Sequence, residues 1–101
     1  MKTSELTGHF LNVAVALAMG HKPPFGIDGF FPSTDWSQGG PIIEEWMIDC
    51  NTYRNGWRAA RHVSTAPTYG YGPTPLIAAM RCYVASKMGE EINIPNEVSS
   101  T

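Results

Sequence analysis

The chain has 101 residues, of which 43% are hydrophobic, and a formal net charge of −2. This length supports one domain with its own core, and the composition excludes an intrinsically disordered chain. The slight acidic excess argues against a nonspecific duplex binder, because such proteins gain affinity from a surplus of cations. We therefore expect no nucleic-acid partner, although a local basic patch is compatible with this charge.

The first predicted element is a helix that begins at Thr3 or Ser4 and ends before Gly20. Its apolar residues recur every three to four positions, at Leu6, Phe10, Val13 and Leu17. Leu11, Ala14, Val15 and Ala18 widen this stripe. A helix with so many apolar residues should be largely buried, either under a sheet or against a second copy of the chain. The second arrangement favours a homo-oligomer. The run is too short to span a membrane, which needs about 20 apolar residues.

The middle of the chain predicts strands. Residues 21–40 are rich in Pro and Gly, with one possible short strand at Gly26–Phe31. Pro41–Asp49 is the best strand candidate because of its large β-favouring side chains. The pair Asn55-Gly56 is a strong hairpin signal, predicted to join residues 50–54 with residues 57–63 through a type I′ turn.

The second predicted helix has clear boundaries. Thr74 caps its start, Pro75 fits its first turn and Gly89 ends it. Its expected inner face consists of Leu76, Ile77, Met80, Val84 and Met88, with Tyr83 alongside. We expect one domain over residues 1–91 and a polar, frayed tail over residues 92–101.

These elements predict an α+β fold. A small antiparallel sheet of two to four strands would pack with an N-terminal and a C-terminal helix, both on one face or one on each. The two cysteines, Cys50 and Cys82, lack the CxxC spacing and are expected to be free thiols.

Catalytic signals are weak. His9, His21 and His62 have no metal-binding spacing, and nothing activates a pair formed by His62 with Cys50 or Cys82. We therefore expect no enzyme activity, cofactor or metal.

The carboxylates Glu44, Glu45 and Asp49 are best explained as cross-strand partners of Arg54, Arg58 and Arg61. These arginines could instead hold an anionic ligand, with Trp57 stacking on a base. The two interpretations are compatible with each other.

Two loops are candidate ligand sites. The first, residues 32–41, places polar side chains around one indole before two glycines, as a nucleobase or sugar site requires. Its predicted ligand-binding residues are Thr34, Asp35, Trp36 and Gln38. The alternative is a turn in which Asp35 bonds its own backbone and Trp36 fills the core.

The second loop, residues 69–75, leads into the C-terminal helix, whose N-terminus could accept one phosphate. The Thr74 hydroxyl and the backbone amide of Leu76 would hold it. Arg58 and Arg81 are weaker candidates for the same ligand.

Three segments resemble a known family: the opening MKTSELTGHFLNVAVALAMG, PSTDWSQGGPIIE from Pro32 to Glu44, and GPTPLIAAMRCYVASKMGEE from Gly72 to Glu91. They are similar to the phage NinX-like proteins, small proteins of tailed phages and prophages whose function is unknown. The resemblance implies a likeness to phage ABA sandwich domains, in which a sheet lies between helices.

By analogy with other small phage proteins, the resemblance implies a non-enzymatic sponge in the host bacterial cytoplasm. It would sequester a small nucleotide-like immune signal, such as a cyclic nucleotide or cyclic ADP-ribose. One alternative is an accessory protein that binds and modulates a host protein. A second is a small nucleotide hydrolase.

Overall fold

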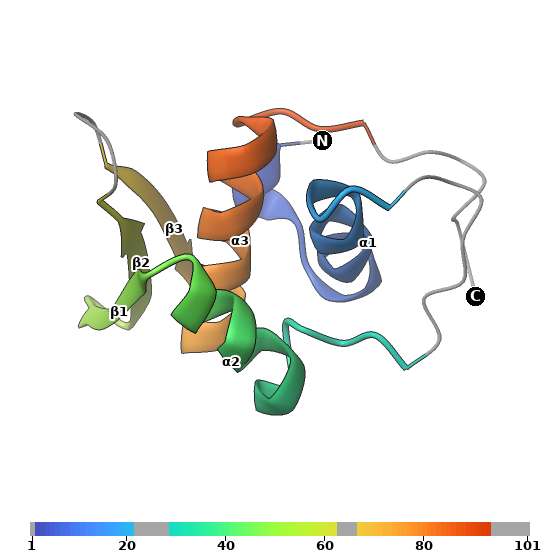
Figure 1. Cartoon of the computed structure of the whole chain (residues 1–101). Helices are drawn as coiled ribbons and strands as arrows, with labels where there is room; N and C mark the ends of the chain where they lie inside the picture. Colours follow the sequence, from blue (N-terminus) through green and yellow to red (C-terminus); the bar gives the residue numbers. More distant parts are fainter. Residues whose placement is uncertain (1, 22–28, 63–66, 94–101) are drawn as a thin grey trace.

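Helix α3 (Pro75–Met88) occupies the middle of the molecule and contacts every other helix and strand (Figure 1). The computed structural model describes residues 2–21, 29–62 and 67–93. The Thr74 hydroxyl accepts a hydrogen bond from the Ile77 amide at 3.1 Å, and Gly89, with a φ of 89°, ends the helix. The predicted helix is thus confirmed at both ends, because its capping signals are local.

Three strands form one antiparallel sheet in the order β1-β2-β3. They are β1 (Ile48–Tyr53), β2 (Gly56–Arg61) and β3 (Thr68–Gly72). The predicted hairpin is confirmed, but its two-residue loop is Arg54-Asn55, since Gly56 already pairs with Tyr53. Only Arg54 has a positive φ in this loop (56°), which fits a type II′ turn rather than the predicted type I′ turn.

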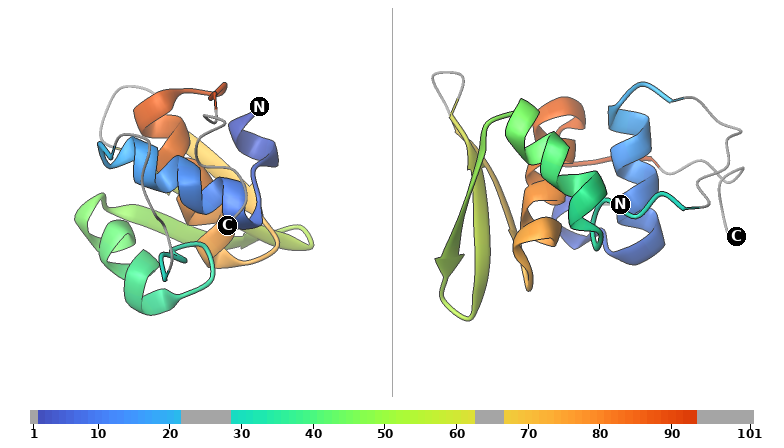
Figure 2. Two further views of the ribbon diagram at one scale, coloured as in Figure 1. Left: turned by 90° about the vertical axis from the view of Figure 1, so that its right-hand side faces the viewer. Right: turned by 60° about the horizontal axis from the view of Figure 1, so that its bottom comes forward.

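Helices cover one face of this sheet. Helix α3 lies directly on β3 and β2, and helix α1 (Gly8–Ala18) packs on the far side of α3 (Figure 2). The chain is therefore an α+β domain with a three-stranded antiparallel sheet and its helices to one side. In the described ranges no helix lies on the other face, so the sandwich implied by the family resemblance is not formed by these residues.

Helix α1 begins later than predicted. Thr3–Glu5 form a separate 3-10 turn, η1, and the α-helix starts at Gly8 after an extended break. The buried apolar residues of this segment include Leu6, Leu11, Val13, Ala14, Val15 and Ala18, and Leu17 packs against the core from a partly buried position. Phe10, predicted to be on the apolar stripe, is instead exposed. Because the stripe is covered within one chain, it no longer requires a second copy.

The predicted strand at Pro41–Asp49 is wrong for most of its length. Residues Trp36–Glu45 form helix α2, which contains Pro41, and β1 begins only at Ile48. Asp35 caps this helix, and Ile42, Ile43 and Trp46 meet the core at helical spacing. Ile42 and Ile43 are adjacent and Trp46 follows about one turn later, so all three lie on one face of a helix. This helical spacing outweighs the β-propensity of the isoleucines.

Three smaller expectations need correction or fall outside the described residues. In the possible strand Gly26–Phe31, residues 26–28 are not described and residues 29–31 form turn and irregular backbone. Met88, expected on the inner face of α3, is exposed, whereas Ala78, Ala79 and Cys82 are buried because α3 is covered on two sides. Ile92 is buried, and the rest of the predicted tail from residue 94 lies outside the described ranges.

Candidate functional site

The loop before helix α2 uses its polar side chains on its own backbone. The Asp35 carboxylate accepts hydrogen bonds from the Ser37 amide (2.9 Å) and hydroxyl (2.7 Å), which hold its pKa below the ordinary value. The Gln38 side chain accepts from the Phe31 amide and donates to the Gly29 carbonyl. Asp35 therefore forms the self-bonded turn that was the alternative to a ligand site.

Trp36 and Thr34, by contrast, are exposed. The Trp36 side chain is 56% exposed, so it does not fill the core as the alternative proposed. Its ligand-binding role stays a prediction.

The start of helix α3 lies beside this loop. A Cβ atom on Gly39 would lie 2.6 Å from the Leu76 side chain, so helices α2 and α3 approach closely near their first turns. The Thr74 hydroxyl is engaged by the Ile77 amide, and the Leu76 side chain is buried. The structure thus brings six of the predicted residues to one end of the molecule, where Asp35, Gln38 and Thr74 are engaged in hydrogen bonds.

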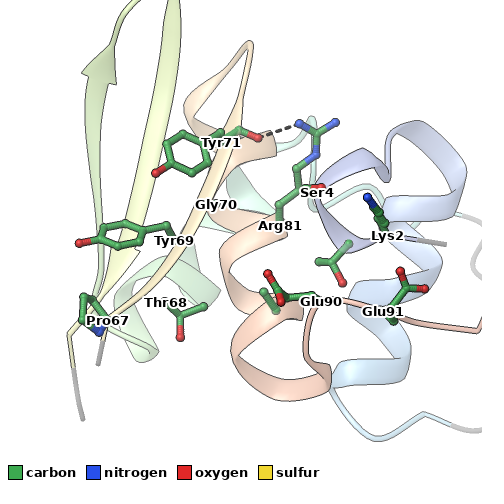
Figure 3. A pocket seen from close by; sticks show the side chains of 12 residues that line it. Lys2, Ser4, Pro67, Thr68, Tyr69, Gly70, Tyr71, Arg81, Glu90 and Glu91 are labelled. Atoms are coloured by element: carbon green, nitrogen blue, oxygen red, sulfur yellow. Dashed lines mark hydrogen bonds between the residues drawn. The ribbon is translucent and has the colours of Figure 1, made fainter. Parts of the chain in front are cut away.

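Arg81 lies away from that end. Its guanidinium donates to the Leu6 carbonyl (2.8 Å) and to the Tyr71 carbonyl (2.7 Å), so it fastens α3 to the N-terminal segment and to β3. Burial lowers the pKa of Arg81 from its ordinary value. It lines a groove of about 760 Å³ along β3, together with residues 2–4, residues 67–71, Ala85, Glu90 and Glu91 (Figure 3).

Arg58 lies on the outer face of the sheet, which the helices leave uncovered. Gly70 and Gly72 face α3, so the alternating Tyr69 and Tyr71 point away from it, as Figure 3 shows. Strand register places Arg58 opposite Tyr71. The eight predicted residues therefore fall into three places and form no single site.

We call this outer surface the tyrosine face and define it by Tyr53, Arg58, Tyr69 and Tyr71. The Tyr71 ring centroid lies 5.3 Å from that of Tyr53 and 6.4 Å from that of Tyr69. The Arg58 guanidinium lies over the rings of both Tyr53 (5.1 Å) and Tyr69 (5.3 Å). Tyr69 and Tyr71 remain 41% and 45% exposed. The face is thus a connected surface of aromatic rings with a cation at its centre.

The edges of the tyrosine face carry further polar groups. The Arg54 guanidinium lies 5.3 Å from the Tyr53 ring centre, and His62 contacts Tyr69 edge-on. The His62 imidazole lies 3.9 Å from the Asp49 carboxylate. The sequence predicts cross-strand pairs between the three arginines and the carboxylates of Glu44, Glu45 and Asp49. This assignment is wrong for Glu44 and Glu45, because both lie in helix α2.

Trp57, which in one interpretation of the sequence could stack on a base beside the arginines, faces the other way. It pairs with Gly72 on the inner face and packs against the core. The tyrosines take its place on the outer face. Their signal in the sequence is the alternation Tyr69-Gly70-Tyr71-Gly72, which places glycines on one side of a strand and rings on the other.

The family model of the bacteriophage P22 NinX proteins matches residues 23–87, more than half of the chain. The chain belongs to the NinX family. No curated protein matches it. The match to NinX spans α2, the whole sheet and nearly all of α3, so the tyrosine face lies within the family's own segment.

Two groups in this NinX chain bear on catalysis. Burial raises the pKa of the Cys82 thiol to about 11 and also raises the pKa of Cys50, so both sulfurs are held as poor nucleophiles. Among residues 2–21, 29–62 and 67–93, no cluster of three metal-ligating side chains occurs. No helix in these ranges is long and apolar enough to cross a bilayer.

Proposed function

We propose that this NinX-family protein is a non-enzymatic binding protein that captures a small nucleotide-like molecule on the tyrosine face. The single observation that carries the proposal is the uncovered layer of three tyrosine rings around the Arg58 guanidinium. Nucleobases stack on such rings whatever their sequence, and guanidinium groups attract phosphate. The raised pKa values of buried Cys82 and half-buried Cys50 keep both thiols protonated, which favours binding over transformation of the ligand.

Family membership supplies the biological setting of the proposal. A phage protein of this kind would act in the host bacterial cytoplasm and lower the free concentration of a nucleotide signal used in host defence. Candidate signals are cyclic nucleotides and cyclic ADP-ribose, which combine a nucleobase with phosphate groups. The anti-defence role is inferred from the phage origin of the family and from the chemistry of the expected ligand. Identification of the ligand tests this role.

Ligand release tests the proposal directly. Protein purified from host cells is denatured and filtered, and the filtrate is analysed by ultraviolet absorbance and mass spectrometry. An intact nucleotide supports capture, whereas a converted product supports the hydrolase alternative. If the filtrate is empty after incubation with host lysate and a host protein is retained instead, the protein-partner alternative replaces the proposal.

Three variants at two aromatic positions locate the site. Calorimetric titration with cyclic AMP and with cyclic ADP-ribose is compared for Tyr71→Ala, Tyr71→Phe and Trp36→Ala. Losing one stacked base should weaken binding by about 1–3 kcal/mol in Tyr71→Ala, while Tyr71→Phe keeps the ring and the affinity. Trp36 is the matched control, because it is an exposed aromatic residue away from the face. If Trp36→Ala abolishes binding and Tyr71→Ala does not, the site is at the leading ends of α2 and α3.

A further inference from the structure

We infer that the tyrosine face binds single-stranded nucleic acid across more than one base. This inference rests on the proposed function of the same face and extends it from a small molecule to a polymer. It also revises the expectation that the chain has no nucleic-acid partner. That expectation used only the net charge of the whole chain.

The rings offer more than one stacking position. Tyr71 contacts both Tyr53 and Tyr69, and these three residues come from the two edge strands, β1 and β3. Arg58, on the central strand, bridges the outer two rings. A mononucleotide has one base and can occupy one of these positions. A strand presents successive bases and can occupy several at once, which is how single-strand-binding sheets gain affinity.

The charge of the chain is segregated along the sequence. Residues 50–89 contain no Asp or Glu and five of the seven basic side chains, Arg54, Arg58, Arg61, Arg81 and Lys87. The rest of the chain holds two basic and nine acidic side chains, a formal charge of −7 that outweighs the +5 and gives −2. Of these five, only Arg54 and Arg58 border the tyrosine face, because Arg61 and Lys87 lie over the Trp46 ring and Arg81 donates to the backbone carbonyls of Leu6 and Tyr71. The face itself thus carries two arginines against the one carboxylate of Asp49.

The cations lie where a phosphate backbone could reach them. Arg58 lies at the centre of the face and Arg54 at its hairpin end. The guanidinium group of each lies close enough to the Tyr53 ring for a cation–π interaction. The only acidic residue of the three strands is Asp49, at the opposite end beside His62. The two arginines thus complement the phosphates of a nucleic-acid strand that runs across the rings. Asp49 is the one acidic residue of the three β-strands that would repel it.

The shape of the face favours a single strand over a duplex. Gly56 and Ala60 belong to the same face and carry at most a methyl group, and Ala60 is only 5% exposed, so neither projects above the rings. Bases in a duplex are stacked on each other and cannot lie on these rings, whereas bases in a single strand can. The shared recognition chemistry is a base stacked on tyrosine with a phosphate near arginine, and both DNA and RNA supply it.

The inference is tested by fluorescence anisotropy of a labelled single strand, which unlabelled competitors displace from the protein. The competitors are thymidine monophosphate, a thymidylate tetramer, the uridylate tetramer, and a thymidylate dodecamer alone or annealed to its adenylate complement. A second stacked base should make the tetramer bind about 5- to 150-fold more tightly than the monophosphate. The free dodecamer should outcompete its duplex. A comparison of the uridylate tetramer with a deoxyuridylate tetramer, which differ only in the 2′-hydroxyl, then assigns DNA or RNA.

Variants separate the roles of ring and charge. Tyr71→Ala should weaken tetramer binding by about 5- to 150-fold. Arg58→Gln should weaken it and reduce the slope of log affinity against log salt by about 0.7, the value for one single-strand phosphate contact. Asp49→Asn should strengthen binding, and Trp36→Ala should leave it unchanged. Thermal melts confirm that each variant is folded.

The outcomes distinguish this inference from the proposed function. If the monophosphate binds and the tetramer binds no more tightly, capture of a small ligand stands and the polymer inference is overturned. Equal affinity for single strand and duplex would also overturn it, because stacking would then play no part. If neither cyclic nucleotides nor any strand binds the folded protein, both proposals fail together.

Discussion

The backbone of Gly70 in strand β3 lies directly against the backbone of Cys82 in helix α3. A Cβ atom on Gly70 would lie 2.9 Å from the Cα atom of Cys82 and would also meet the Ala78 carbonyl oxygen. This contact lets the sheet approach the helix closely, and because side chains alternate along a strand, the neighbouring Tyr69 and Tyr71 point outward. The packing of the core and the exposure of the tyrosine face therefore depend on the same glycine.

Gly70→Ala should destabilise the protein strongly. The added methyl group meets backbone on the helix, which cannot rotate away, so we expect a loss of about 3 kcal/mol in the free energy of unfolding. Gly40→Ala is the matched control, because its new methyl group would lie 3.9 Å from the nearest atom, on Trp36. It should change stability little, because the helix propensity of alanine is offset by the Pro41 ring, which disfavours helical backbone in a preceding residue that has a Cβ atom. Urea denaturation measures both changes. Equal stability of Gly70→Ala and the natural protein would show that β3 and α3 are further apart.

The Thr74 cap gives a second stability prediction. Its hydroxyl satisfies the Ile77 amide at the start of α3, so Thr74→Ala should lower the free energy of unfolding by about 1 kcal/mol. Thr74→Ser keeps the hydroxyl and should be close to neutral. Both are measured by thermal and urea unfolding. A Thr74→Ala variant as stable as the serine variant would contradict the cap, and would leave the hydroxyl available to a ligand.

Local signals predicted α3 and the hairpin because their boundaries are set by adjacent residues. Thr74, Pro75 and Gly89 each act on the backbone of their own helix, and Asn55-Gly56 acts on its own turn. Even there, the turn shifted by one residue, because strand register is decided by side chains on both strands and not by the turn alone.

Helix α2 differs from the strand predicted for Pro41–Asp49 because its helical spacing outweighs its helix-breaking residues. Gly39, Gly40 and Pro41 interrupt the segment, yet all three lie within the helix. The informative signal was Asp35, a favoured N-cap residue whose carboxylate accepts from the Ser37 amide at 2.9 Å and from the Gln38 side-chain amide at 3.1 Å. Gly39 has a packing reason to be in this helix, since it lies against the Pro32 carbonyl and Leu76.

The tyrosine face could not be assembled from local sequence. Tyr53 lies on β1, and Tyr69 and Tyr71 lie on β3, so their proximity depends on the pairing of β2 with both strands. Arg58 was identified as a candidate without its partners. The alternating tyrosines were instead interpreted as a loop leading into the next helix. Which face of a sheet stays uncovered is a property of how the helices pack.

Trp36→Ala should leave the fold intact. The side chain is more than half exposed, and the polar groups of Asp35 and Gln38 that hold the turn do not use the indole. We expect a change of roughly 0.5 kcal/mol or less in the free energy of unfolding, as for other surface substitutions. Urea denaturation and circular dichroism test this. Failure of the variant to fold would place the indole in the core, and would remove it as a control for the binding experiments.

The raised pKa of Cys82 predicts a loss of stability in alkaline solution. Burial raises its pKa from 9.0 to about 11, because the thiolate is poorly solvated inside the protein. Between these values the unfolded chain loses the thiol proton while the folded chain keeps it, so unfolding releases a proton and rising pH favours it. The contribution of Cys82 is complete below pH 9.0 and is lost as pH rises toward about 11, at up to about 1.4 kcal/mol per pH unit.

The Cys82→Ala variant isolates this effect. Desolvation also raises the pKa values of Cys50 and Tyr83, so the natural protein should lose stability faster than the contribution of Cys82 alone. Urea unfolding at several values between pH 8 and pH 10 should give a smaller slope for Cys82→Ala than for the natural protein. Cys50 provides an internal reference, because it is half-buried and should react with a thiol reagent before the fully buried Cys82. Equal slopes in the two proteins, or faster labelling of Cys82, would mean that its sulfur is not sealed between β3 and α3, and the close contact at Gly70 would then also be in error.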